Sequence, residues 1–332
     1  MNHPLPLAAQ PMTGTGLPDY PPFVLNRETA PAFWLVGTLW LVLASGRQTA
    51  NRLTVIEQVM ATGLGPPTHR HPTASEGFYI LEGSCSFNAQ GETRHAGPGT
   101  FVYLPRLLPH SFSVDTSEVR ALNFYLPASF ELVVMSLAHP ASARRRPSLA
   151  ESAPPDSQEQ IRILSALYGQ EAVMALPFAV PPAPELMLTK PNDKGIGVPH
   201  FATAEQVPAV RLFGLDWRLL AAADDTEGAY DLFEVVVPAG AGMPLRTAHQ
   251  DEALYVLAGK LTLAYDDQPQ PAGVGTFAYF PAGGAFQWHA EGGDARVLVF
   301  HLPGGFDRVV AEAAADDDRA IAKLTELGTR FL

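Results

Sequence analysis

Four side chains of types that bind transition metals lie within one short stretch of the first half of the chain. His69 and His71 are two residues apart, so on a β-strand both imidazoles point to the same face. Glu76 follows after a short proline-containing turn, and His110 lies further on, behind a second proline turn. Three neutral imidazoles and one carboxylate suit a divalent first-row metal, with iron, manganese, nickel, cobalt and copper left open. The spacing predicts one metal site with room for one or two exchangeable ligands.

The spacing of these residues resembles the two sequence motifs of the cupin superfamily. In this chain the motifs read His69-x-His71-x4-Glu76-x6-Gly83 and Gly99-x5-Pro105-x4-His110. Two positions depart from the family pattern, because Leu107 stands in place of a glycine and Val114 in place of an asparagine. Neither position supplies a ligand in that family. The resemblance therefore implies that the same three histidines and the glutamate hold the metal.

The chain contains this pattern twice, which predicts two copies of one domain. Glu76–Gly83 aligns with Glu252–Gly259 at a shift of 176 residues (252 − 76). Upstream, Gly37 aligns with Gly214 at a shift of 177 residues (214 − 37), so one residue was gained or lost between the copies. Short runs rich in Val, Leu, Phe and Tyr alternate with frequent Pro and Gly, which favours strands. We expect an all-β protein of two tandem cupin (jelly-roll) β-barrels with short helices after each barrel.

The second copy lacks the three histidines. Their positions are occupied by Arg246, Ala248 and Phe286, and only the glutamate is retained, as Glu252. A buried carboxylate without a cation is costly. We therefore predict that the Arg246 guanidinium pairs with Glu252 at the position that corresponds to the metal in the first copy. The alternative is a weak metal site made of His249, Glu252 and His289.

Taken together, these features resemble the quercetin 2,3-dioxygenase (quercetinase-like) bicupins. The resemblance rests on a bicupin of 332 residues, the longer gap before Glu76, the glycine that follows it, and a helical tail that ends in Tyr168-Gly169. It implies a metal-dependent dioxygenase acting on a flavonol-like or other enolisable aromatic small molecule, with O2 as the second substrate. In that family the flavonol binds the metal through a deprotonated hydroxyl, and its heterocycle is cleaved with loss of carbon monoxide.

The same resemblance implies two roles for Glu76, as a weak metal ligand and as the catalytic base. As the base it would take the proton of the substrate hydroxyl. A partly apolar pocket can raise the pKa of a carboxyl group toward the working pH, which suits such a role. We therefore expect the pKa of Glu76 to be raised.

Strand alternation also predicts a substrate pocket. If Glu76 and His110 face inward, the neighbouring inward positions are those of Phe78, Ile80, Phe112 and Val114. They would form an apolar cavity for a hydrophobic or aromatic substrate, although the interior of a β-barrel is apolar in any case. The alternation places no lysine or arginine inward, which argues against a small anionic substrate such as oxalate.

Because cupin barrels serve many activities, two alternatives to a dioxygenase stay open. One is another cupin enzyme, such as a decarboxylase, an isomerase or a hydrolase of a metal-chelating small molecule. The other is a non-catalytic bicupin that binds a small molecule. Oxygen uptake with quercetin distinguishes the dioxygenase from other enzymes, and metal analysis distinguishes both enzymes from the binding protein.

The composition of the chain indicates which binding partners to exclude and which cellular compartment to expect. Lys and Arg number 22 and Asp and Glu number 34, so the formal net charge is −12. A chain this acidic is not expected to bind nucleic acid or an anionic membrane. The single cysteine, Cys85, excludes an internal disulfide and favours the cytoplasm. The edge strands of a β-barrel present unpaired backbone groups that a second subunit can cover, so a homodimer is one expected form of the protein.

The distribution of prolines and repeats predicts four segments. We expect an extended N-terminal arm over 1–25, a metal-binding barrel with a helical tail over 26–178, a proline-rich linker over 179–195, and a degenerate barrel with a C-terminal helix over 196–332. The two expected helices have apolar residues three apart, at 158–168 and at 317–327, and each is followed by a glycine.

Overall fold

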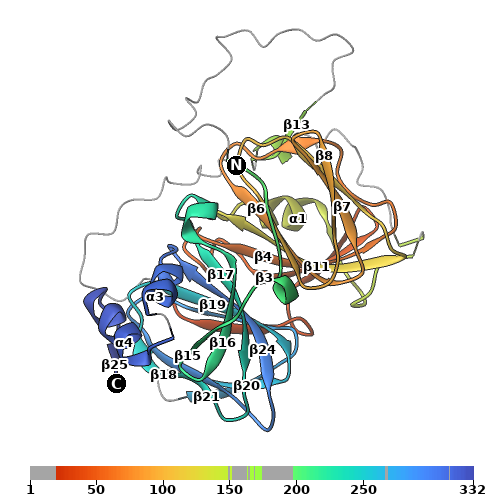
Figure 1. Cartoon of the computed structure of the whole chain (residues 1–332). Coiled ribbons are helices and arrows are strands. Elements are labelled where there is room, and N and C mark those ends of the chain that lie inside the picture. The colour runs from red at the N-terminus through yellow and green to blue at the C-terminus, as the bar shows by residue number, and fades with distance from the viewer. Residues whose placement is uncertain are drawn as a thin grey trace.

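The computed structural model describes residues 20–148, 150–151, 163, 165–167, 169–173, 197–265, 268–313 and 315–332. The described chain forms two β-rich halves, each with a larger and a smaller antiparallel sheet (Figure 1). This arrangement confirms the all-β class with two tandem jelly-roll domains and a few short helices. None of the helices in these residues is long and apolar enough to cross a bilayer.

The metal-ligand motif of the first half lies on an eight-stranded and a five-stranded sheet. The larger sheet has the order β12-β2-β3-β4-β11-β6-β9-β14, and the smaller has the order β13-β5-β10-β7-β8. The larger sheet consists of β2 (Ala32–Leu35), β3 (Thr38–Ala44), β4 (Thr54–Ala61), β6 (Ser75–Glu82), β9 (Thr100–Leu104), β11 (Glu118–Leu126), β12 (His139–Pro140) and β14 (His200–Thr203). The smaller sheet consists of β5 (His69–Arg70), β7 (Cys85–Ala89), β8 (Glu92–Ala96), β10 (His110–Val114) and β13 (Glu171–Ala172).

The second half repeats this plan with a seven-stranded and a five-stranded sheet. Their orders are β1-β22-β19-β24-β17-β16-β15 and β21-β20-β23-β18-β25. The larger sheet consists of β1 (Phe23–Asn26), β15 (Val210–Leu212), β16 (Leu215–Ala221), β17 (Asp231–Val237), β19 (Asp251–Ala258), β22 (Thr276–Phe280) and β24 (Ala295–Leu302). The smaller sheet consists of β18 (Gly242–Thr247), β20 (Lys260–Tyr265), β21 (Gln268–Gly273), β23 (Ala285–Ala290) and β25 (Arg330–Phe331).

The two halves exchange edge strands. β1 comes from the beginning of the described chain but pairs with β22 in the larger sheet of the second half, where Phe23 is opposite Tyr279. In return β14, which follows residue 197, pairs with β9 in the larger sheet of the first half. Each exchanged strand covers an edge that would otherwise present unpaired backbone groups. The predicted segment boundaries stay a prediction, and residues 1–19 of the arm and the linker 179–195 lie outside the described residues.

The larger sheets pack against each other through one apolar cluster. It contains residues of both halves, among them Phe124 and Phe300, which occupy equivalent positions of the repeat (300 − 124 = 176). Their rings meet edge to face with centroids 5.1 Å apart. Strands such as β9 and β22 are therefore buried on both faces, which explains their nearly continuous apolar sequences.

Short helices follow each jelly roll. α1 (Glu131–Leu137) follows β11 and was not predicted, whereas α4 (Asp317–Glu326) matches the helix expected at 317–327. α3 (Phe306–Ala313) precedes α4, and short 3-10 turns occur at Ala204–Gln206 and Ala223–Thr226 among the described residues. Within the predicted helix at 158–168, the structure describes only 163 and 165–167, and these are helical.

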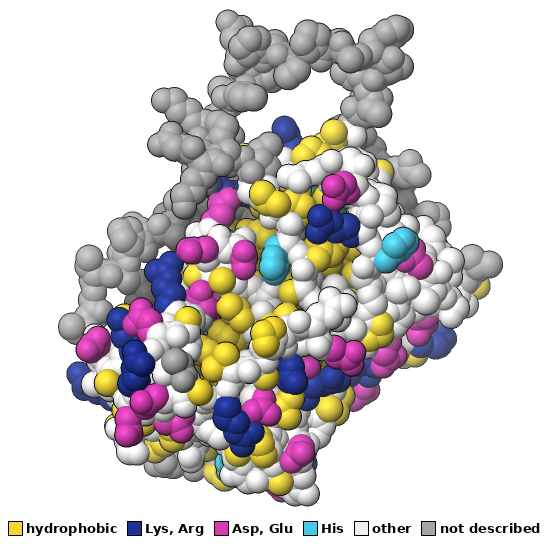
Figure 2. Space-filling view, viewed as in Figure 1, with side chains coloured by type: hydrophobic (Ala, Val, Ile, Leu, Met, Phe, Trp, Pro, Cys, Tyr) yellow, Lys and Arg dark blue, Asp and Glu magenta, His cyan; other side chains and the backbone are white. Residues whose placement is uncertain are grey.

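Acidic and basic side chains are mixed on the surface. Figure 2 shows Asp and Glu interspersed with Lys and Arg on one face, with hydrophobic side chains between them. Several surface arginines pair with carboxylates, for example Arg94 with Glu92 and Arg145 with Glu151. Among the described residues on this face, basic side chains are therefore mixed with acidic ones.

Candidate metal centre

The four predicted metal ligands converge at one point between the two sheets of the first half. His69 on β5 and His110 on β10 are direct partners in the smaller sheet. Glu76 faces them from β6 of the larger sheet, and His71 follows β5 in the turn that leads to β6. All four side chains are buried, and one ligand atom from each lies within 4.8 Å of the others. The turn and the two sheets thus bring together residues 41 positions apart (110 − 69).

One oxygen of Glu76 is the meeting point of the three imidazoles. Its Oε2 lies 2.9 Å from Nε2 of His110, 3.2 Å from Nε2 of His71 and 3.8 Å from Nε2 of His69. Two ligands of one ion lie at most about 4.4 Å apart when each bond is about 2.2 Å long. The four donor atoms are therefore spaced to surround a single ion after small movements.

Backbone carbonyls orient each of the three imidazoles. The carbonyls of Pro67, Gly169 and Leu108 lie 3.1, 3.1 and 2.8 Å from the Nδ1 atoms of His69, His71 and His110 respectively. A carbonyl only accepts, so each Nδ1 must donate to it, and each Nε2 faces Glu76. This is the outer arrangement that metal-bound histidines typically have, with the tautomer set by a fixed acceptor.

The second oxygen of Glu76 is held by two residues that the motif does not contain. Oε1 accepts hydrogen bonds from the Tyr125 hydroxyl at 2.6 Å and from Nδ2 of Asn123 at 2.9 Å. Both donors lie on β11, the neighbour of β6, where Tyr125 is directly opposite Glu76. Their spacing of two residues places them on one face of the strand, and this was the available sequence signal for them.

The pKa of Glu76 lies well below its usual range, contrary to the expectation that it is raised. Burial raises the pKa of this carboxyl group, but hydrogen bonding to His110, His69 and His71 outweighs burial and lowers it. Burial also lowers the pKa of His69 and raises that of Tyr125. The expectation considered only the apolar surroundings. The result is an ionised carboxylate beside a neutral imidazole and a protonated phenol.

These features fit one divalent transition metal. Nitrogen from neutral imidazole and oxygen from carboxylate form a donor set for first-row metals, and all four donors are already turned inward. In the part of the chain that the structure describes, this is the single cluster of its kind. The first half therefore carries a site suited to one metal ion.

The four predicted pocket residues lie in the core next to this site. Phe78, Ile80, Phe112 and Val114 are all buried members of one apolar cluster of the first half. The rings of Phe78 and Phe112 contact each other with centroids 5.1 Å apart, and Phe78 also packs on Phe87 at 5.1 Å. In this conformation they fill the interior, and their contact with a substrate stays a prediction.

The equivalent place in the second half contains the predicted ion pair. Nη2 of Arg246 donates to Oε2 of Glu252 over 2.5 Å, and both side chains are buried. The guanidinium carbon lies 4.4 Å from the ring centroid of Phe286, the residue at the position of His110. Trp288 donates to Oε1 of Glu252 at 2.7 Å. The prediction that Arg246 pairs with Glu252 is confirmed.

The alternative metal site in the second half is wrong. His289 is exposed on β23, and His249 is only half-buried, with its Nδ1 2.9 Å from the Thr329 hydroxyl. Neither imidazole joins Glu252 in a metal-binding cluster. The physical reason is that Arg246 already neutralises Glu252, and side-chain alternation turns His289 away from the interior.

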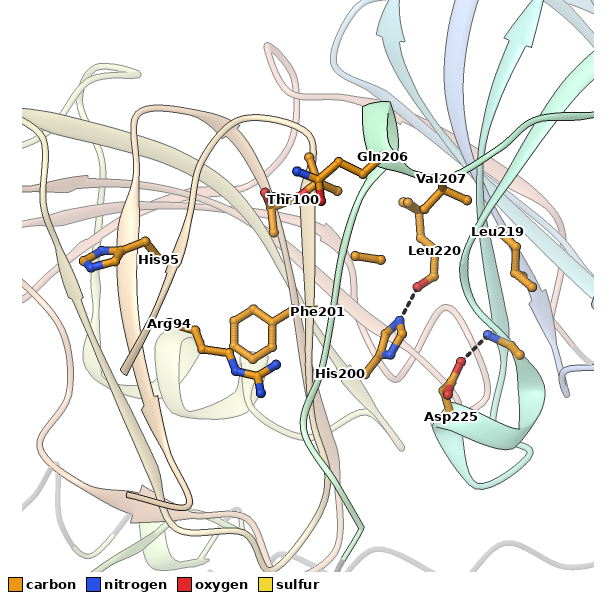
Figure 3. A pocket seen from close by; sticks show the side chains of 13 residues that line it. Arg94, His95, Thr100, His200, Phe201, Gln206, Val207, Leu219, Leu220 and Asp225 are labelled. Carbon is orange, nitrogen blue, oxygen red and sulfur yellow. Dashed lines mark hydrogen bonds between the residues drawn. The ribbon is translucent and has the colours of Figure 1, made fainter. Parts of the chain in front are cut away.

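A surface groove also lies away from the metal centre, beside β14 and β16 (Figure 3). Its volume is about 720 Å³, and it contains none of the four metal ligands. The Arg94 guanidinium lies 5.3 Å from the ring centroid of Phe201, and Nε2 of His200 is 2.8 Å from the Leu220 carbonyl. These polar groups of the groove already have protein partners.

Comparison with known proteins agrees with the repeat and with the fold. Residues 56–125 and 233–301 each match the family model for the cupin domain. Quercetin 2,3-dioxygenase from Bacillus subtilis (strain 168) is 19% identical over 289 residues, which are 86% of this chain and 84% of the relative.

Solved structures of oxalate decarboxylase from Bacillus subtilis share the fold. One, from a study of its Mn(II) centres, has a TM-score of 0.57 at 14% identity and covers 89% of this chain and 79% of that one. Another, at pH 4.6, has a TM-score of 0.55 at 15% identity and covers 88% and 78%. The chain thus contains two matched cupin domains, one in each half, in a two-domain fold similar to that of these structures.

Proposed function

We propose that this bicupin is a metal-dependent dioxygenase that acts on a flavonol-like or other enolisable aromatic small molecule. The observation that carries the proposal is the convergence of three imidazole Nε2 atoms on Oε2 of Glu76, with 2.9 Å as the shortest distance. A relative described as quercetin 2,3-dioxygenase, aligned over 86% of the chain, supports the choice of reaction. Similarity to a dioxygenase in sequence and to oxalate decarboxylase in fold supports the choice of an enzyme.

We propose different roles for the three histidines and for Glu76. His69, His71 and His110 would hold the metal, and Glu76 would be both a ligand and the acceptor of the substrate's hydroxyl proton. A bound divalent cation would supply a Lewis acid that lowers the pKa of a coordinated hydroxyl and a centre at which O2 reacts. Because its pKa is held low, Glu76 is ionised at neutral pH and can accept a proton, but it is a weaker base than a carboxylate whose pKa lies near the working pH.

The surroundings of the centre support an aromatic substrate over a small dianion. In the described part of the first half, no lysine or arginine is buried, so an oxalate-sized ligand would find no fixed cation besides the metal. Phe78 and Phe112 belong to the apolar cluster of the first half. The rings of Tyr125 and Phe130 stack with centroids 4.9 Å apart, and the centroid of Tyr125 lies 5.3 Å from that of His71. We propose that Phe78, Ile80, Phe112 and Val114 contact the substrate after the interior rearranges.

Oxygen uptake with quercetin tests the proposal. The full chain is loaded in turn with iron, manganese, nickel, cobalt and copper, and carbon monoxide is measured alongside O2. We expect one carbon monoxide for each O2 consumed with at least one metal. Glu76→Gln should lower the rate by about 10²–10⁴-fold. Glu92→Gln, an exposed carboxylate on β8, is the matched control and should leave the rate unchanged.

Other outcomes point to the alternatives. Carbon dioxide release from oxalate without net O2 consumption would replace the dioxygenase by a decarboxylase. Quercetin binding without turnover in any metal form would favour a non-catalytic binding protein. Metal content of Glu76→Gln is measured in parallel, because normal turnover by a metal-loaded variant would exclude Glu76 as the base.

The cytoplasm and a homodimer are our proposals for compartment and assembly. Cys85 is free and buried, in keeping with a protein that needs no disulfide. Sedimentation at several protein concentrations would decide between monomer and dimer.

A further inference from the structure

A chain of two buried amides runs from the metal centre into the interior of the first half. Nδ2 of Asn123 donates to Oε1 of Glu76 at 2.9 Å, and Nε2 of Gln58 donates to Oδ1 of Asn123 at 3.0 Å. Gln58 lies on β4 and Asn123 on the neighbouring β11, where Gln58 is opposite Ala121 and therefore diagonal to Asn123. Both side chains are at most 2% exposed.

The carbonyl of Gly77 fixes the direction of the hydrogen bonds between these amides. Nδ2 of Asn123 lies 3.2 Å from this carbonyl, which only accepts, so Asn123 must turn its NH2 group toward Gly77 and Glu76. Oδ1 of Asn123 is then available only as an acceptor, and Gln58 must turn its own NH2 group toward it. Oε1 of Gln58 consequently points away from Asn123.

This arrangement leaves a polar atom without a partner. Oε1 of Gln58 is buried and accepts no hydrogen bond from the described residues. An unsatisfied buried acceptor is unfavourable, so an amide at this position lowers stability unless it serves another purpose. The chain thus retains an unfavourable group next to the candidate metal centre.

The second half shows that the fold itself does not require amides here. At the repeat shifts of 177 (235 − 58) and 176 (299 − 123), Gln58 and Asn123 correspond to Val235 and Val299. Both valines are fully buried in the apolar core of the second half. The amide pair therefore occurs in the half that has the histidine cluster, and valines replace it in the half that has the Arg246 ion pair.

From these observations we infer that Gln58 and Asn123 are positioning residues of the metal centre. They fix the rotation of the Glu76 carboxylate, so that Oε1 is held by donors and Oε2 faces the three imidazoles. Asn123 acts directly on the carboxylate, and Gln58 acts through Asn123 by preventing its amide from turning over. If that amide turned, its oxygen would face the carboxylate and repel it.

Metal affinity and the Co(II) spectrum of the full-length protein test this inference without any substrate. Gln58→Val and Asn123→Val each introduce the residue that the second half has at that position. We expect each to weaken Co(II) binding by about 10–100-fold and to shift the visible absorption bands. Gln58→Glu should do the same, because a carboxylate cannot donate to Oδ1 of Asn123.

The double variant decides whether Gln58 acts through Asn123. If it does, Gln58→Val should add no further loss of Co(II) affinity in the Asn123→Val background. Additive losses would overturn this route. Gln58→Met, which keeps the side-chain length, replaces Gln58→Val if the latter fails to fold, as judged by circular dichroism.

Gln250→Leu is the matched control. Gln250 is also a buried glutamine with one NH2 hydrogen bond, to the carbonyl of Pro303 at 2.6 Å, and an unpartnered Oε1, but it lies in the second half. Its replacement should leave the Co(II) affinity and spectrum unchanged. Affinities and spectra of the Gln58 variants within two-fold of wild type would overturn the inference, whatever the protein's substrate is.

Discussion

Arg246 donates to Glu252 over 2.5 Å at the position in the second half that corresponds to the metal-ligand cluster of the first. The guanidinium also donates to the carbonyl of Pro244 at 3.1 Å and covers the ring of Phe286. A fixed side-chain cation thus satisfies the carboxylate that the repeat has kept. Each half thus has a buried glutamate, which belongs to a cluster of four candidate metal donors in the first half and to an ion pair in the second.

Breaking the ion pair should destabilise the protein. Arg246→Met leaves Glu252 buried with a hydrogen bond from Trp288 but without a nearby arginine. We expect the free energy of unfolding to fall by about 3–5 kcal/mol, measured by urea denaturation. The double variant with Glu252→Gln removes the stranded charge as well and should recover most of the loss. A loss below about 1 kcal/mol in the single variant would contradict this account.

Metal content should depend on the first half alone. The full chain should bind one divalent ion, and His110→Phe, which introduces the residue found at position 286, should abolish tight binding. The reciprocal change, Phe286→His, is the control and should add no second ion because Arg246 occupies the place of one. Elemental analysis after dialysis measures both. Two ions bound to the wild-type chain would show that the second half also binds metal.

The contact between the halves should depend on reciprocal tyrosines. The Tyr79 hydroxyl donates to Glu234 of the second half, and the Tyr255 hydroxyl donates to Glu57 of the first at 2.9 Å. These residues are equivalent in the repeat (255 − 79 = 176; 234 − 57 = 177). Tyr79→Phe should lower the free energy of unfolding by about 1.5–3 kcal/mol, because a buried carboxylate loses a donor.

A weaker tyrosine contact provides the control for this prediction. The Tyr20 hydroxyl lies 3.4 Å from Oδ2 of Asp251, a carboxylate that also accepts from Tyr279 at 2.5 Å. Tyr20→Phe should therefore have a smaller effect than Tyr79→Phe in the same urea titration. Equal losses in both variants would mean that the Tyr79 bond contributes no more than a peripheral contact.

Cys85 should be unreactive in the folded protein. Burial, with a smaller contribution from Asp115, raises the pKa of its thiol from 9.0 to about 12. The thiolate is the reactive form, so iodoacetamide should modify the native protein slowly at pH 8 and the urea-unfolded protein rapidly. Mass spectrometry measures the modified fraction. Equal rates in the two states would show that the thiol is accessible and its pKa unperturbed.

The raised pKa of Cys85 also has a consequence for stability. The unfolded chain ionises this thiol at lower pH than the folded chain does, so the unfolded state loses its proton first. The contribution of Cys85 to stability is present below pH 9 and is lost as the pH rises from 9 toward 12. Cys85→Ala should make the alkaline decrease in the free energy of unfolding less steep.

The sequence alone determined the two-fold repeat and the candidate metal-ligand set. His69 and His71 are two residues apart on a strand, and Glu76 and His110 follow at the motif spacing, so local geometry and the family pattern sufficed. The Arg246–Glu252 pair was predictable for a similar reason. A retained buried carboxylate needs a cation, and the repeat alignment showed which residue stood at the place of a ligand.

Only the tertiary structure decided which groups surround these ligands. The carbonyl of Gly169 reaches Nδ1 of His71 from 98 residues away, and Asn123 reaches Glu76 across 47 residues. Such partners depend on how strands pair and on where a loop returns, and neither follows from the spacing of residues along the chain. The pKa of Glu76 was misjudged for a different reason, because the expectation considered burial and left out the three imidazoles that lower the pKa.

The exchange of β1 and β14 between the halves also required the folded structure. Phe23–Asn26 and His200–Thr203 are short runs without a pattern that assigns them to either half. β1, from the first half of the sequence, pairs with a strand of the second half, and β14, from the second half of the sequence, pairs with a strand of the first. In both cases the strand covers an open edge of the other half's sheet. Periodicity along the chain reports which face of a strand is buried, whereas the choice of partner strand is made by the complete set of edges and apolar surfaces in three dimensions.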